Sequence, residues 1–267
     1  MQLIEVPAKQ GYVWFRQGIW LFRRNPLAFL TLFFAYLLAM TLISAVPLIG
    51  GVLPLIFVPG VAVGFMAACR DTIAGKPVFP TILVDGFRSY GPNVTKHLFM
   101  LGGIYVVAMT LVLAASALVD GGELLRLMTL GGTLDTEAIE NSNVPLAVLA
   151  SLAVYVPVSM LFWFAPVLTA WHDVPPVKAM FFSIVSCWRN KGAFMVYGAL
   201  WFALSMGVAI GLSNLLRALG AGDYALAIVM PALILVTTMI YCSFYATYRG
   251  CYGVQEKPAE EAPDSGR

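Results

Sequence analysis

The chain has 267 residues, of which 60% are hydrophobic and only 11% are charged. An average soluble domain carries about 25% charged residues, so this composition excludes a soluble globular protein and indicates a polytopic membrane protein. The net charge of +2 gives no basic field of the kind that nucleic-acid binding requires, so no nucleic-acid partner is expected. The four cysteines show no metal-ligand spacing, and no metal or other cofactor is predicted.

Six stretches are long and apolar enough to cross a bilayer, which takes about 20 mainly apolar residues. None of the six contains Asp, Glu, Lys or Arg, and they cover residues 27–49, 51–69, 97–119, 145–170, 192–213 and 224–247. A Pro/Gly cluster from Pro47 to Pro54 separates the first two, and such a cluster breaks a helix. The sequence therefore predicts an all-α fold, a bundle of six transmembrane helices that begins with a tight hairpin.

The basic residues predict the orientation of this bundle. Of the 16 Lys and Arg residues, 14 lie in the N-terminal segment, in the loops after the second and fourth spans, and in the tail. The opposite side holds only Arg126 and Arg217. Because short loops rich in Lys and Arg stay in the cytoplasm, both termini are expected there. Residues 1–253 should form a single transmembrane domain, and the polar, acid-rich residues 254–267 a disordered cytoplasmic tail.

Three segments look alike and predict a threefold pseudo-repeat. Each has an amphipathic stretch, an aromatic–Arg pair, an Asn with Gly or Pro, and then a helical hairpin. The aromatic–Arg pairs are Phe22–Arg23, Phe87–Arg88 and Trp188–Arg189. Mid-span prolines mark the return helix of each hairpin, as at Pro59, Pro157 and Pro231.

The amphipathic stretches have the spacing of helices that lie in a membrane interface. In the third, Phe181 and Trp188 lie on one side, and Ser183, Ser186 and Asn190 on the other. We expect all three helices at the cytoplasmic interface. One interpretation is ordinary anchoring by an aromatic belt and long basic side chains, and the other is a specific lipid or partner site.

The aromatic–Arg–Asn entry, the six spans and the region from Asp173 to Ser183 give the chain a resemblance to a known group. It resembles uncharacterised bacterial six-helix inner-membrane proteins, similar to the YciC-like family and to the membrane domain found beside glycerophosphodiester phosphodiesterases. The resemblance covers residues 13–248 and implies a membrane module of unassigned activity in the bacterial inner membrane. It carries over no active-site residues.

Enzymatic chemistry is not predicted. A hydrolytic site needs a nucleophile with a base, or clustered metal ligands. Asp71, His172 and Asp173 fall on one side of the membrane and could meet, but three such residues are too few to indicate an enzyme. The carboxylates of the outer loop between Asp120 and Val144 fit no calcium-binding spacing.

Two function classes stay open. The leading hypothesis is a non-enzymatic scaffold or sensor whose partners are membrane lipids or a protein of unknown identity. Its candidate headgroup-binding residues are Arg23, Arg24, Arg88, Arg189, Lys96 and Lys191, which a threefold packing would bring to one ring. The alternative is a small-solute or lipid transporter with a neutral polar pathway through Tyr155, Ser159 and Tyr241.

Two pairs of glycines, Gly60 with Gly64 and Gly207 with Gly211, lie one helical turn apart. Small residues at this spacing allow helices to approach closely. Packing within the chain is the expected use of both pairs.

Overall fold

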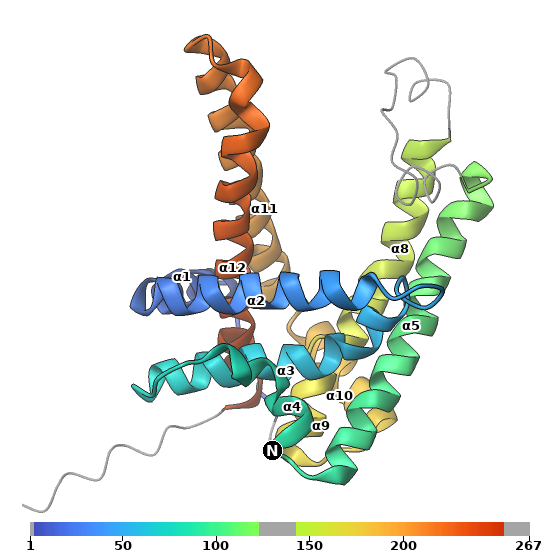
Figure 1. The fold of residues 1–267 in the computed structure, drawn as a ribbon. Helices are drawn as coiled ribbons and strands as arrows, with labels where there is room; N and C mark the ends of the chain where they lie inside the picture. The colour runs from blue at the N-terminus through green and yellow to red at the C-terminus, as the bar shows by residue number, and fades with distance from the viewer. Residues whose placement is uncertain (1–2, 123–142, 254–267) are drawn as a thin grey trace, which may run out of the picture. The chain divides into compact units, whose positions relative to one another are not determined.

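The computed structural model describes residues 3–122 and 143–253, and these are almost entirely helical (Figure 1). The predicted tail, residues 254–267, and most of the outer loop, residues 123–142, lie outside the described residues. The elements are α1 (Gln10–Arg24), α2 (Pro26–Ser44), α3 (Leu53–Ile73), η1 (Pro80–Val84), α4 (Asp85–Arg88), α5 (Pro92–Asp120), α8 (Val144–Phe162), α9 (Ala165–His172), α10 (Pro176–Arg189), α11 (Lys191–Ala218), η2 (Gly222–Tyr224) and α12 (Ala225–Tyr252).

The six predicted spans are confirmed as helical segments long and apolar enough to cross a membrane. Within the described residues these segments are Pro26–Ser44, Leu53–Ile73, Pro92–Asp120, Val144–His172, Lys191–Ala218 and Gly222–Tyr252. The break between the first two is also found, since α2 ends at Ser44 and α3 begins at Leu53. In this turn the Gly50 N–H donates to the carbonyl of Val46, and a Cβ on Gly50 would overlap the carbonyl of Ser44.

The fourth span differs from the single helix that the sequence predicts. It is interrupted at Trp163 and Phe164, between α8 and α9. Pro166 explains the break, because it has no N–H to donate to Phe162 and its ring clashes with that carbonyl. By contrast, Pro59, Pro157 and Pro231 lie inside continuous helices.

The described chain divides into two compact units. One joins the N-terminal segment up to Pro26 to the chain from Arg189 onward, and the other is Leu27–Trp188. In the first, α1 packs against both α11 and α12. In the second, α5 packs between α3 and α8, and Figure 1 shows α5 and α8 side by side.

The two glycine pairs have different surroundings. A Cβ on Gly60 would overlap the ring of Phe87, and one on Gly64 would lie 2.5 Å from the carbonyl oxygen of Ile82. This pair therefore lets η1 and α4 pack closely on α3, as expected of packing within the chain. A Cβ on Gly207 or Gly211 would meet no described atom within 4 Å.

Candidate functional site

Helix α10 carries its polar side chains inward and its aromatic side chains outward. Its buried stripe consists of small and polar residues, among them Ala179, Ser183 and Ser186. Phe181 and Trp188, on the other side, are 60% and 64% exposed. The amphipathic pattern correctly predicted this helix. It did not reveal that the polar stripe is the side that packs on protein, which leaves the aromatic side outward.

Ser183 lies where the polar stripe meets the interrupted fourth span. Its hydroxyl accepts a hydrogen bond from the N–H of Phe164 at 2.9 Å and donates one to the carbonyl of Met160 at 2.7 Å. In an unbroken helix the Phe164 N–H would donate directly to Met160, four residues earlier. The hydroxyl therefore stands between two backbone groups that the break separates, and it fixes α10 against this span.

Helix α1 is held by one face against α11 and α12, and Figure 1 shows it running crosswise to them. A Cβ on Gly11 would overlap the carbonyl of Ala193, and one on Gly18 would overlap the side chain of Ser243. Trp14, between these glycines, is fully buried. Such close contact fixes the rotation of α1, so its opposite face is directed outward.

The outward face of α1 alternates aromatic and basic residues at every fourth position. This surface, the α1 stripe, consists of Tyr12, Arg16, Trp20 and Arg24. The guanidinium carbon of Arg16 lies 5.7 Å from the ring centroid of Tyr12, and that of Arg24 lies 4.9 Å from the ring of Trp20. Tyr12 and Trp20 are each 50% exposed. A hollow of about 320 Å³ is lined by Tyr12, Val13, Arg16, Gln17 and Trp20.

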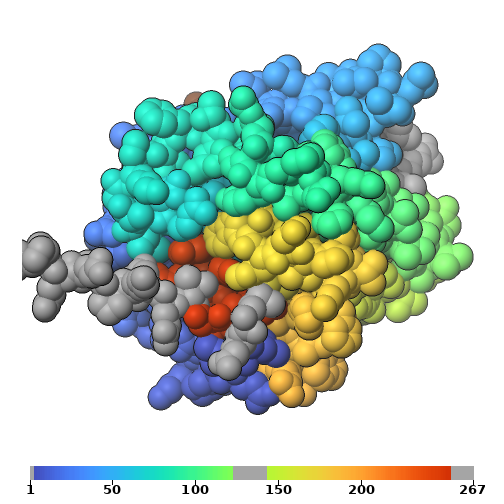
Figure 2. All heavy atoms as spheres, turned by 90° about the horizontal axis from the view of Figure 1, so that it is seen from below, coloured from blue at the N-terminus to red at the C-terminus, as the bar shows by residue number. Residues whose placement is uncertain are grey.

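The segment before α1 is tied to the adjoining ends of α11 and α12. Asn190 accepts a hydrogen bond from the N–H of Val6 at 2.8 Å and donates one to the carbonyl of Ile4 at 3.1 Å. The N–H of Ile4 donates to the carbonyl of Cys251 at 2.8 Å. Figure 2 shows the dark-blue N-terminal part of the chain beside the red end of α12. Asn190, predicted on a polar helix face, is thus a buried clamp that is 1% exposed.

The six predicted headgroup-binding residues, Arg23, Arg24, Arg88, Lys96, Arg189 and Lys191, are all exposed. Arg189 already has a partner, since its Nε lies 3.2 Å from a carboxylate oxygen of Glu5. Arg88 and Lys96 belong to the Leu27–Trp188 unit, and the other four residues to the other unit. Because these residues fall in two separate units, the predicted ring stays a prediction.

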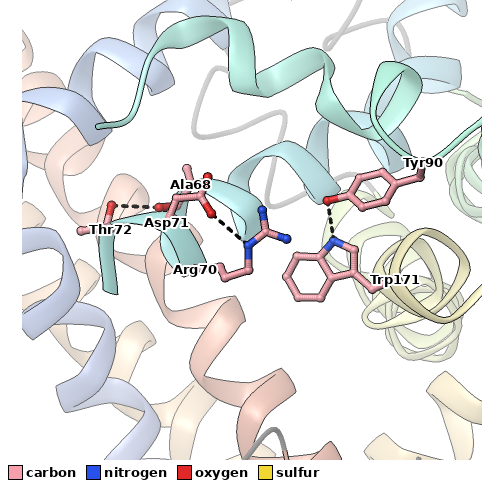
Figure 3. Close-up of polar contacts among 6 residues, drawn as sticks. All are labelled: Ala68, Arg70, Asp71, Thr72, Tyr90 and Trp171. Carbon is pink, nitrogen blue, oxygen red and sulfur yellow. Dashed lines mark hydrogen bonds and ion pairs between the residues drawn. The ribbon is translucent and has the colours of Figure 1, made fainter. Parts of the chain in front are cut away.

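A polar junction connects the ends of α3 and α9 with the turn before α5 (Figure 3). The Nε of Arg70 lies 2.9 Å from a carboxylate oxygen of Asp71, and its guanidinium carbon lies 5.3 Å from the ring centroid of Trp171. The indole N–H of Trp171 donates to the Tyr90 hydroxyl at 2.9 Å. Sequence reasoning missed Tyr90 and Trp171 here, although the pair Arg70–Asp71 was visible at the end of the second span.

A hollow of about 430 Å³ opens at this junction and is bordered by Tyr90, Trp171, His172 and Asp173. Figure 2 shows the yellow segment around α9 against the green start of α5. His172 and Asp173 border the hollow, whereas Asp71 pairs with Arg70. Across the two described stretches, no three His, Cys, Asp or Glu side chains are placed to hold a metal ion.

The predicted pathway residues each lie in their own local surroundings, in two different units of the structure. Tyr155 is exposed, and Ser159 donates to the carbonyl of Val156 in its own helix at 2.7 Å. The ring of Tyr241 lies 5.4 Å from that of Phe244. Tyr155 and Ser159 belong to one unit and Tyr241 to the other, so the pathway also stays a prediction.

These features define a class, a multi-pass helical membrane protein with aromatic and basic helix faces directed outward. The chain belongs to the same family as the Probable inner membrane protein BTH_II0599 of Burkholderia thailandensis, to which it is 68% identical over 267 residues, 99% of each chain. No protein-family profile matches the sequence. No solved structure matches it. The narrower resemblance to YciC-like proteins stays a prediction.

Proposed function

We propose that the protein is a non-enzymatic inner-membrane protein that organises or senses lipid from its cytoplasmic side. The observation that carries this proposal is the orientation of α10, with small polar residues buried and Phe181 and Trp188 exposed. An outward aromatic surface is a costly patch in water, but it is favoured at the boundary between lipid headgroups and acyl chains. The relative's placement in an inner membrane supports the same location.

Basic residues near both ends of α10 extend this argument to headgroups. Lys178 is exposed, with its Nζ 5.8 Å from the ring centroid of Phe182, and Arg189 is exposed at the last position of the helix. A basic residue near an anionic membrane surface contributes about 1 kcal/mol to binding. Both residues lie in the loop that the charge distribution assigns to the cytoplasm. The proposal therefore places α10 in the cytoplasmic interface, with its aromatic side against lipid.

The transporter alternative has less support from the described residues. A neutral pathway needs hydroxyl groups that are free to contact a solute. Ser159, Thr237 and Thr238 instead donate to carbonyls of their own helices at 2.7, 2.8 and 2.8 Å. This is the most frequent use of such residues in membrane helices.

The proposal is tested by the lipids that accompany the protein out of its native membrane. The full chain is extracted into polymer-bounded membrane discs, and its lipids are compared with those of the bulk membrane by mass spectrometry. We expect enrichment of anionic phospholipids, and a reduced enrichment when Lys178 and Arg189 are both replaced by Gln. Wild-type discs with the same lipid composition as the bulk membrane would contradict the proposal.

A further inference from the structure

We propose that the α1 stripe is a binding site for the phosphate groups of anionic phospholipids, selected from the cytoplasmic leaflet. This inference rests on the proposed function and names the ligand class and the helix that binds it. It adds three residues to those predicted from sequence, because Tyr12, Arg16 and Trp20 were not among them.

The two arginines of the α1 stripe are placed to bind phosphate groups. Residues four apart on a helix lie on one face, and each step of four advances by about 6 Å. Arg16 and Arg24 are therefore about 12 Å apart along the helix axis, each beside the aromatic ring one turn earlier. Stacking on a ring restrains a guanidinium while its N–H edge stays available, and this edge matches two oxygens of a phosphate. The stripe thus has two arginine side chains on one helix face that are already oriented to bind phosphate, and this distinguishes it from scattered surface cations.

The charge around the stripe also suits phosphate groups. Helix α1 contains three arginines and no acidic residue. Glu5, the acidic residue shortly before it, lies 3.2 Å from Arg189 and outside the stripe. Among the described residues neither Arg16 nor Arg24 forms an ion pair, so a negatively charged ligand would meet positive charge along this face.

The depth of α1 along the spans follows from its contact with α12. Helix α12 has 28 residues and is about 42 Å long, whereas the hydrocarbon core is about 30 Å thick. Gly18 meets α12 at Ser243, nine residues before the helix ends at Tyr252, or about 14 Å along its axis. If the excess length of α12 extends into the cytoplasmic headgroup region, α1 crosses it near the boundary with the acyl chains.

The lining of the hollow beside Arg16 favours a lipid over a soluble anion. The hollow beside Arg16 is lined by Tyr12, Val13 and Trp20 as well as by polar groups, and these three are partly exposed. Free phosphate offers nothing apolar to cover them. A phospholipid supplies the phosphate and the glycerol–acyl region together, which is the environment that Tyr and Trp favour.

The test uses the full-length protein in vesicles of phosphatidylcholine, with or without phosphatidylglycerol, and counts retained phosphatidylglycerol by native mass spectrometry. The test variant is Arg16→Gln with Arg24→Gln. The matched control is Lys76→Gln with Arg217→Gln, which removes the same two positive charges. Both residues are exposed and lie outside α1. We expect the test variant to weaken phosphatidylglycerol binding by roughly tenfold or more, since losing a hydrogen bond to a charged group has about this effect. The control should lose at most the roughly fivefold effect of one surface cation, Lys76, because Arg217 is predicted on the opposite side of the membrane.

Further outcomes of this experiment test the inference. Arg16→Lys with Arg24→Lys should restore less than half of the binding, because an ammonium cannot make the bidentate contact. Full restoration by Lys, or equal binding by the test and control variants, would overturn the stripe as a site while leaving the proposed function in place. Wild-type protein that shows no preference for phosphatidylglycerol would overturn both. Glycerol phosphate in solution should not displace the lipid, and displacement would assign the site to a soluble anion.

Discussion

The hydroxyl of Ser183 donates a hydrogen bond to the carbonyl of Met160 from 2.7 Å, and so occupies the place of a missing helical hydrogen bond. The N–H of Phe164, which would donate to this carbonyl in an unbroken helix, donates instead to the Ser183 hydroxyl at 2.9 Å. Ser183 and Phe164 are fully buried, so the Phe164 N–H has no water as a ready substitute for the hydroxyl. One side chain thus joins the outward-facing helix α10 to the break in the fourth span.

Replacing Ser183 by Ala should destabilise the fold by about 1–3 kcal/mol, because the buried Phe164 N–H loses its acceptor and the Met160 carbonyl keeps only a long contact of 3.8 Å from the Cys187 thiol. A typical interhelical hydrogen bond in a membrane is worth only about 0.6 kcal/mol, so the larger loss would reflect the double contact. Unfolding of the purified protein in mixed micelles, followed by loss of helicity, measures this. Ser186→Ala is the control, since the Ser186 hydroxyl donates to Phe182 in its own helix. Equal losses in the two variants would contradict the bridging role.

The two glycine pairs give a second prediction. Gly64→Ala should destabilise the protein by about 1–3 kcal/mol, because its Cβ would lie 2.5 Å from the carbonyl oxygen of Ile82 and 2.7 Å from the Cα of Leu83. Gly207→Ala should be neutral or stabilising by up to about 1 kcal/mol, because alanine favours a helix and the added methyl meets no described atom within 4 Å. The same unfolding assay compares the variants. A loss at Gly207 as large as that at Gly64 would mean that Gly207 has a close neighbour.

The spans were predictable because a helix that crosses a bilayer needs about 20 mainly apolar residues, and such a stretch is visible in the sequence itself. Helix α3, for example, has no charge before Arg70. The break near Pro166 was harder to predict, because Pro59, Pro157 and Pro231 are tolerated within continuous helices. What distinguishes Pro166 is a partner far along the chain, Ser183, that satisfies the separated backbone groups.

The candidate site was predictable only in part. The spacing of the residues shows that α10 is amphipathic, but it does not tell which of its two faces packs on protein. Arg23 and Arg24 are visible in the sequence as a basic pair. The outward placement of Arg16 depends on its contact with Tyr12 and on Gly11 and Gly18, which fix the rotation of α1. Such constraints come from tertiary contacts, which are not visible in a local pattern.

A third prediction concerns Asn190, which holds the segment before α1. Asn190→Ala should release this segment, because the N–H of Val6 and the carbonyl of Ile4 lose their partner. Limited trypsin digestion should then cleave after Lys9 faster than in the wild type. Arg189→Gln should change the cleavage rate little. Both side chains of its ion pair with Glu5 are exposed, and such pairs contribute about 0–1 kcal/mol to stability. Equal protection of Lys9 in Asn190→Ala and wild type would rule out the clamp.

The orientation of the chain gives a fourth prediction. A reporter fused after Ala221, in the turn between α11 and α12, should be active outside the cytoplasm, and one fused after Gly253 should be active inside it. Alkaline phosphatase and green fluorescent protein make a complementary pair of reporters for these two positions. An outside reading at Gly253 would reverse the orientation and move α1 away from the cytoplasmic leaflet.

The last prediction separates a shared ring from independent anchors among the residues predicted from sequence. Arg24 belongs both to that set and to the α1 stripe, whereas Arg88 lies at the end of α4 in the other unit. We expect Arg88→Gln to weaken binding to phosphatidylglycerol vesicles only about fivefold, the effect of one surface cation, and Arg24→Gln to weaken it more. Because independent sites contribute additively, the double variant should show the product of the two factors. A titration at fixed salt measures all three variants. If Arg88→Gln alone removed most binding and Arg24→Gln then added nothing, the two residues would share one site, and the predicted ring would replace independent anchoring.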